Sequence, residues 1–306
     1  MGMLLLQKPY EKSKSRDHVA CLERRMKSWS AGEIEELMVE GRTIQGRLRL
    51  SKTRSPETTT RVFTNLMLQG RVAAAMRIIS EVPSGILDLE QQVSEGKTVR
   101  DVLGEKHPEG REATQDVLLS ASEGPQPPHP VLFERITGAS IKQSALRTFG
   151  GAGPSGVDAA GWRRMCTSFH GASKQLCDAV AEVARRIATT YVDPGGLAAF
   201  TACRLCPLDK CPGVRPIGIA EVARRIVGKS IMEVVKDDVV NAAGSLQLAA
   251  GQPAGCEAAV HAMRQLFAAE ETQGILLIDA HNAFNSLNRR AAMWNVRVVC
   301  PALGPV

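Results

Sequence analysis

The segment from Gly274 to Asn288 constrains the fold more than any other part of the chain. Apolar residues occupy positions 275–278 without interruption, and the carboxylate of Asp279 follows directly. A short apolar run of this kind is typical of a strand buried on both faces. An ionised carboxylate at the edge of a core costs several kcal/mol unless it has a partner. Asp279 is therefore expected to cap the next turn, to pair with a cation or to bind a metal ion.

A small residue and an aromatic residue follow Asp279 at a short distance, as Ala283 and Phe284. A tight turn would bring the Phe284 ring close to whatever the carboxylate holds. The order of these three residues resembles the first palm motif of reverse transcriptases. The resemblance implies that Asp279 binds catalytic Mg²⁺ and that the backbone at Ala280 faces the incoming nucleotide. It also implies that Phe284 lies beneath the sugar and excludes a ribose 2′-OH.

Upstream, residues 200–208 and 214–219 form two short β-like runs, joined by a turn that contains a Pro-Gly pair. The predicted hairpin carries Lys210 at its tip and Arg215 just inside its second strand. These cations are either solvated surface charges or a clamp for phosphates, in which arginine supplies a planar bidentate grip and lysine a point charge. The hairpin resembles that of reverse transcriptase fingers, which implies that Lys210 and Arg215 contact the triphosphate.

Two further segments resemble the same family in the family's order. The glycine-rich loop at 150–158, followed by Trp162, resembles the connection into the fingers, although Ala159 stands where the family has glycine. No Gly-Lys-Ser/Thr follows that loop, which excludes a P-loop. Gln252 and Gly255 resemble the segment before the first palm strand, which implies a contact with the template. A turn that caps the next helix is an equally good physical account of those two residues.

The sequence predicts an α+β protein with a helical N-terminal module and part of a right-hand polymerase, the fingers and the start of the palm. We expect a basic disordered arm at 1–60, in which only residues 21–38 have a helical pattern, and a small helical module at 61–119. A Pro-rich linker at 120–130 and a partial reverse transcriptase domain at 131–306 should follow. Apolar spacing predicts helices at 61–79, 86–93, 98–105, 141–149, 173–191 and 221–241.

Three helices have a predicted buried face. For 173–191 it comprises Leu176, Val180, Val183, Ile187 and Tyr191. For 221–241 it comprises Val222, Ile226, Val235 and either Ile231 or Met232. For the helix after Gly255 it comprises Cys256, Val260, Met263 and Phe267.

Charge and cysteine content restrict the partners and the compartment. The formal net charge is +6, and the basic excess lies in residues 1–54 and 131–306 around an acidic middle. A basic surface suits a polyanionic partner. No apolar run approaches the roughly 18 residues that span a membrane. We therefore expect an intracellular protein, nuclear or cytoplasmic, with reduced cysteines.

The three cysteines Cys203, Cys206 and Cys211 are spaced as zinc ligands could be. A tetrahedral site needs a fourth ligand, and only Cys256 or His261, brought close by the fold, could supply it. Zinc is therefore not expected.

The resemblance implies an enzyme that adds dNTPs to a DNA primer 3′ end on an RNA template, by two-metal phosphoryl transfer. The 306 residues contain Asp279 but not the family's second motif, an aromatic-x-Asp-Asp hairpin, so we expect a retrotransposon reverse transcriptase fragment without activity. Asp237 and Asp238 lie in a helical run and are expected to be solvated helix charges. The alternatives are a non-catalytic nucleic-acid-binding remnant and a zinc-stabilised interaction domain.

Overall fold

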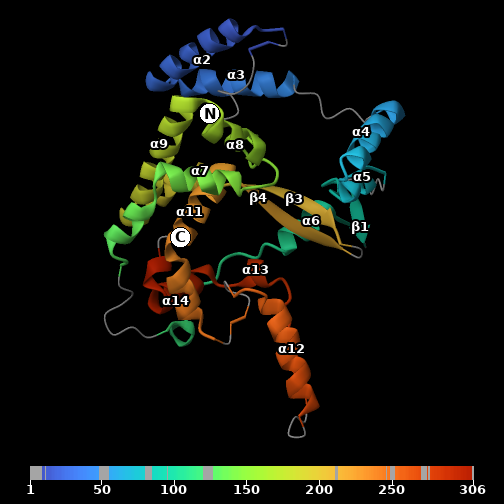
Figure 1. The fold of residues 1–306 in the computed structure, drawn as a ribbon, viewed down its shortest axis with the longest axis vertical. Helices are drawn as coiled ribbons and strands as arrows, with labels where there is room; N and C mark the ends of the chain where they lie inside the picture. Colours follow the sequence, from blue (N-terminus) through green and yellow to red (C-terminus); the bar gives the residue numbers. More distant parts are fainter. Residues whose placement is uncertain are drawn as a thin grey trace. The chain divides into compact units, whose positions relative to one another are not determined.

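The computed structural model describes residues 9–10, 12–47, 55–79, 85–94, 96–119, 127–210, 213–245, 247–248, 252–269, 274 and 276–304 (Figure 1). The chain divides into two compact units. Unit 1 comprises Met1–Val99, Pro154–Val157 and Leu205–Gly218, and unit 2 comprises Arg100–Gly153, Asp158–Arg204 and Ile219–Val306. Helices and small sheets occur together, so the predicted α+β class is correct at this coarse level.

Unit 1 contains helices and two two-stranded sheets, with order β1-β2 and β3-β4. Its elements are α2 (Ser15–Ser30), α3 (Ile34–Arg47), α4 (Pro56–Leu68), α5 (Val72–Ile79), β1 (Gln92–Ser94), β2 (Lys97–Thr98) and most of β3 (Cys203–Asp209) and β4 (Val214–Ala220).

The expectation of a disordered arm at 1–60 is wrong for residues 15–47, which form the helix pair α2–α3. Glu40 of α3 forms ion pairs with Arg24 and Arg25 of α2, at 2.7 and 2.8 Å. Leu37 and Ile44 form a small buried cluster. Contacts between the two helices order this segment, although its composition is typical of a mobile chain.

The helix predicted at 86–93 is also wrong. Ile86 forms an antiparallel bridge with Leu208 of β3, and the backbone N–H of Leu87 donates to the carbonyl of Pro207 at 2.9 Å. The edge of β3 presents backbone groups that need partners, and this segment supplies them. The predicted helix at 98–105 is confirmed as α6 (Val99–Glu105).

Unit 2 is mostly helical. Its elements are η1 (Gln115–Val117), η2 (Pro130–Arg135), α7 (Gly138–Leu146), α8 (Ala159–Thr167), α9 (His170–Thr189), η3 (Pro194–Leu197), α10 (Ala198–Thr201), α11 (Val222–Ala243), α12 (Gly255–Ala268), α13 (Ala283–Ser286), α14 (Arg289–Val299) and η4 (Pro301–Leu303). Of the linker predicted at 120–130, residues 120–126 lie outside the described residues.

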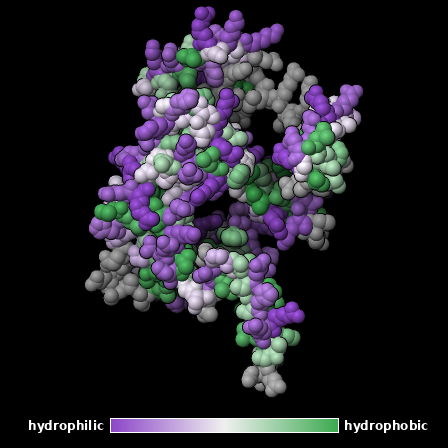
Figure 2. All heavy atoms as spheres, viewed as in Figure 1, coloured by the Kyte–Doolittle hydropathy of each residue, from purple (hydrophilic) through white to green (hydrophobic). Residues whose placement is uncertain are grey.

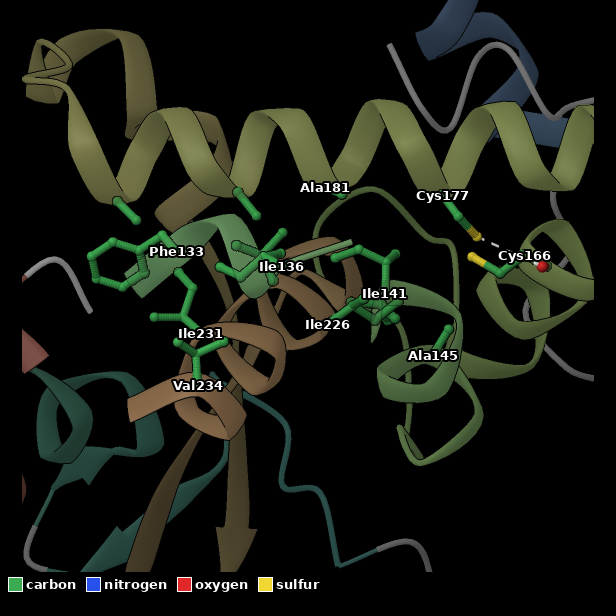
Figure 3. Close-up of a cluster of buried hydrophobic side chains, with 14 of the residues drawn as sticks. Phe133, Ile136, Ile141, Ala145, Cys166, Cys177, Ala181, Ile226, Ile231 and Val234 are labelled. Atoms are coloured by element: carbon green, nitrogen blue, oxygen red, sulfur yellow. Dashed lines mark hydrogen bonds between the residues drawn. The ribbon is translucent and has the colours of Figure 1, made fainter. Parts of the chain in front are cut away.

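The main core of unit 2 lies where η2, α7, α8, α9 and α11 meet (Figure 3). Phe133 of η2, Ile141 of α7 and Ile226 of α11 are among its fully buried side chains. On α11 the predicted inward residues are confirmed, with Ile231 buried and Met232 partly exposed. Regular apolar spacing along this long helix was sufficient to identify its buried face.

The predicted face of α9 is displaced. Its buried residues are the small ones, namely Ser173, Cys177, Ala181, Ala184 and Ala188. Leu176 and Val180 lie only at the margin of the core, and Val183 and Tyr191 are exposed. Small side chains allow the backbones of neighbouring helices to approach closely, and α9 packs against both α7 and α8.

On α12 the predicted apolar stripe is exposed. Val260, Met263 and Phe267 are accessible, and apolar side chains appear on the outside of the helix (Figure 2). Within the described parts of the chain, no helix is long and apolar enough to cross a membrane.

Candidate nucleotide-binding site

The predicted hairpin forms as β3–β4, except that residues 200–201 belong to α10, and it carries both candidate cations at its closed end. The N–H of Lys210 donates to the carbonyl of Gly213 at 3.0 Å, which closes the turn, although residues 211–212 lie outside the described residues. Val214 is fully buried and anchors the start of β4. The side chains of Lys210 and Arg215 are both exposed, with no ion pair to any described residue. Two unneutralised cations therefore lie five positions apart on one hairpin.

The strand predicted before Asp279 is absent from the described residues of this segment. Residues 276–278 have no strand partner among the described residues, and their side chains are 83–86% exposed. A buried strand needs neighbours on both edges, and the described strands β1 to β4 pair only as β1-β2 and β3-β4. The first palm strand is therefore a wrong prediction for residues 276–278.

Asp279 is exposed and makes no hydrogen bond or ion pair with a described residue. It does not cap the helix that follows, because the N-cap of α13 is Asn282, with φ 52° and no side-chain cap. Ala280 is exposed as well, and the Phe284 ring on α13 is 92% exposed. The carboxylate and the ring are therefore both accessible to a ligand.

Three asparagines at intervals of three position this turn, and sequence reasoning did not identify them. Asn282 donates from Nδ2 to the carbonyl of Lys106 at 2.9 Å and accepts from Asn285 at 3.2 Å. Asn288 donates to the carbonyl of Arg111 at 2.9 Å, and its Oδ1 caps α14. The repeated Asn-x-x-Asn spacing after Asp279 is the sequence pattern from which these residues could have been identified.

The chain at 112–119 also holds α14 in place. Arg290 pairs with Glu112 at 2.5 Å, and the indole N–H of Trp294 donates to the carbonyl of Leu119 at 2.9 Å. Asn295 exchanges hydrogen bonds with the backbone of the same segment. The segment that carries Asp279 is thus connected to residues about 175 positions earlier in the sequence.

At the predicted template segment, Gly255 is buried at the start of α12, and Gln252 is exposed. The N–H of Gly255 donates to the carbonyl of Gln252 at 3.3 Å. A Cβ at Gly255 would collide with the backbone carbonyl of Leu248. The close packing of this turn is enough to explain why glycine occupies position 255, without any contact to a template.

The predicted glycine-rich loop packs closely on the start of α11. A Cβ on Gly153 would lie 2.8 Å from the carbonyl carbon of Ala220 and 2.8 Å from the N of Glu221. These are backbone atoms that cannot rotate away. Gly228, within α11, has nothing within 4 Å of its would-be Cβ.

We expect Gly153→Ala to lower the free energy of unfolding by about 1–3 kcal/mol, because the added methyl overpacks this contact. The matched substitution Gly228→Ala should raise it by about 0.5–1 kcal/mol, because alanine favours a helix interior. Urea denaturation of the two variants measures both changes. Equal effects of the two would contradict the close packing of Gly153.

Of the three cysteines spaced as zinc ligands, the structure describes Cys203 and Cys206. Cys203 is exposed and Cys206 is buried, as residues three apart on a strand face opposite sides, and Cys211 lies outside the described residues. No group of three or more His, Cys, Asp or Glu among the described residues could hold a metal ion.

Two other cysteines are buried in the core. Cys177 donates from Sγ to the carbonyl of Cys166 at 3.7 Å (Figure 3). Burial, together with the neighbouring Cys177, raises the pKa of Cys166 to about 12. Cys166 is therefore a protonated core residue at neutral pH and a poor nucleophile.

Lys210 and Arg215 belong to unit 1, whereas Asp279, Ala280, Phe284, Gln252 and Gly255 belong to unit 2. The convergence of these residues on one nucleotide stays a prediction. Comparison with protein-family models, with curated proteins and with solved structures found no match to this chain.

Proposed function

We propose that this chain is part of a retrotransposon reverse transcriptase, comprising the fingers and the first catalytic motif, and that it binds a magnesium–dNTP complex. Lys210 and Arg215 would hold the triphosphate, Asp279 would ligate Mg²⁺ and Phe284 would lie beneath the sugar. The template contact would fall at Gln252 and Gly255. The relevant partners are an RNA template, a DNA primer and a dNTP.

The β3–β4 hairpin is the observation that carries this proposal. Its two exposed cations have no carboxylate partner among the described residues, so both keep their donors available for phosphate oxygens. The order of the four resembling segments along the chain gives further support. The exposed carboxylate of Asp279 supplies a hard oxygen ligand of the kind that Mg²⁺ prefers.

Turnover in the family needs carboxylates on a second motif to hold two metal ions. Asp237 and Asp238 do not supply them, because both are exposed residues of α11. We therefore propose binding, and not polymerisation, as the activity of these residues.

The decisive experiment is equilibrium dialysis of the full chain with radiolabelled dATP and Mg²⁺. The double variant Lys210→Ala/Arg215→Ala should weaken binding at least tenfold. A hydrogen bond to a charged group contributes about 1.5–3 kcal/mol, and about 1.4 kcal/mol is a factor of ten.

The control is Arg186→Ala/Lys236→Ala, which removes the same two charges from exposed positions on α9 and α11. We expect it to bind dATP within about twofold of the unmodified chain, because loss of net charge alone acts weakly through solvent. Equal weakening in the two variants, or no dATP binding by the unmodified chain at millimolar concentration, would refute the proposal.

A further inference from the structure

Cations surround the turn that follows α7. Lys229 Nζ donates to the carbonyl of Arg147 at 2.7 Å, and Arg163 Nη2 donates to that of Thr148 at 3.0 Å. Arg225 donates to the carbonyls of Phe149 at 2.8 Å and Gly151 at 2.5 Å. Backbone carbonyls of a turn that are not paired with backbone N–H groups need other donors, and here cationic side chains supply them. The turn at 147–151 is therefore held by long basic side chains.

These contacts create what we call the cation cluster, defined as Arg147, Arg163, Arg204, Arg225 and Lys229. Arg204 belongs to it because its Nη2 lies 3.8 Å from the position of a Cβ on Gly151. Among the described residues, the cluster forms one ion pair, from Arg147 to Glu233 at 3.6 Å. The cluster is thus a local excess of positive charge within unit 2.

Phe149 projects from the same turn. Its side chain is 71% exposed, which is an unfavourable position for a phenyl ring in a free protein. Its backbone carbonyl is held by Arg225, and the guanidinium of Arg163 lies over the ring, 4.9 Å from the centroid. The ring is therefore held in one position and is also accessible to a ligand.

We propose that Phe149 and the cation cluster form a stacking platform for single-stranded nucleic acid. An unpaired base stacks on the Phe149 ring, and the adjoining phosphates lie near Arg147 and Lys229. Aromatic rings within basic surfaces bind single strands in this way, since every base offers a π-face and every linkage a negative charge. This inference deepens the proposed function and rests on it for the choice of a nucleic acid as the ligand.

Single-stranded nucleic acid fits better than a duplex. In a duplex the bases are stacked on each other, and the ring could reach a base face only after unstacking. The cations alone would bind the phosphates of a single strand or of a duplex. A contribution of Phe149 to the affinity is therefore expected only for the single strand.

The test is fluorescence anisotropy of the full chain with a labelled oligouridine of 12 nucleotides, and with a labelled RNA duplex of 12 base pairs. Phe149→Leu should weaken binding to the single strand about fivefold or more, because it removes the stacked ring and keeps an apolar side chain. Phe149→Trp should retain the affinity. Neither change touches the backbone carbonyl that Arg225 holds.

Phe169 provides a matched control. It is also an exposed phenylalanine with an arginine over its ring, Arg164 at 5.8 Å, but it lies outside the turn that the cation cluster holds. Phe169→Leu should leave the affinity within about twofold.

The platform is refuted if Phe149→Leu binds the single strand as well as the unmodified chain does. It is also refuted if Phe169→Leu weakens binding equally, or if Phe149→Leu weakens duplex binding to the same extent.

Failure of the platform is distinguishable from failure of the proposed function, because dATP binding that depends on Lys210 and Arg215 is measured without any oligonucleotide. Oligouridine binding that depends on Phe149, without dATP binding, would leave the platform standing and refute the nucleotide site.

Discussion

Replacing Phe133 by alanine is expected to lower the free energy of unfolding by about 3–5 kcal/mol. Phe133 is fully buried in the core where η2 meets α9 and α11 (Figure 3). Removing the ring loses its transfer free energy and leaves a cavity that helices packed on several sides cannot close. Urea denaturation followed by far-UV circular dichroism measures the change, because unit 2 is mostly helical.

A matched control is Phe267→Ala on α12, where the ring is 68% exposed. The same atoms are deleted, but few of them leave a packed environment. We expect a change within about 0.5 kcal/mol. Similar losses for the two variants would show that Phe133 is not a core residue.

Replacing Glu40 by alanine is the second change with a large expected effect. Glu40 pairs with Arg25, whose side chain is fully buried, as well as with Arg24. The variant removes a charge-assisted hydrogen bond from each arginine, and such a bond contributes about 1.5–3 kcal/mol. The loss at Arg25 is the larger one, because its guanidinium lies in a poorly solvated position. We expect loss of the α2–α3 helix pair, measurable as reduced amide protection in hydrogen exchange over residues 15–47.

The effect should depend on pH. Burial raises the pKa of Glu40, but hydrogen bonds from Arg24 and Arg25 outweigh it and bring the pKa below its ordinary value of 4.5. A carboxyl with a lowered pKa stabilises the folded state above its unfolded pKa, and that contribution is lost as the pH falls through the folded pKa. The stability difference between the unmodified chain and Glu40→Ala should be full at pH 7 and should shrink below about pH 4.5.

Glu36→Ala is the control for both measurements. Glu36 lies one turn earlier on α3, is exposed and has no ion-pair or hydrogen-bond partner for its side chain among the described residues. We expect little change in protection at any pH. If Glu36→Ala lowered the amide protection as much as Glu40→Ala does, the loss would come from the change in net charge and not from the ion pair.

Local sequence was sufficient where local interactions dominate. The β3–β4 hairpin was predictable because strand-forming runs flank a Pro-Gly turn. The buried face of α11 was predictable because large aliphatic residues recur at helical spacing. The same reasoning placed Lys210 and Arg215 on this hairpin, where both are exposed, and their contact with a triphosphate stays a prediction.

Other features depended on contacts between distant parts of the chain. Ile86 pairs with Leu208, more than a hundred residues away, and this pairing overrides the helical pattern at 86–93. The asparagines after Asp279 bind carbonyls of the segment at 106–111. A sequence pattern does not encode which distant backbone group a side chain will reach.

The segment at 276–278 illustrates the difference most clearly. Its composition suits a buried strand, yet a strand forms only where another strand offers hydrogen bonds, and none of the described strands does so.

By itself, the sequence determined the elements that depend on spacing and turn chemistry, and with them the hairpin that carries the two cations. Tertiary structure alone decided which face of α9 is buried, which turn the cation cluster surrounds and why Phe149 is held in an accessible position. The physical reason is that spacing acts over a few residues, whereas burial and hydrogen-bond partners are properties of the packed chain.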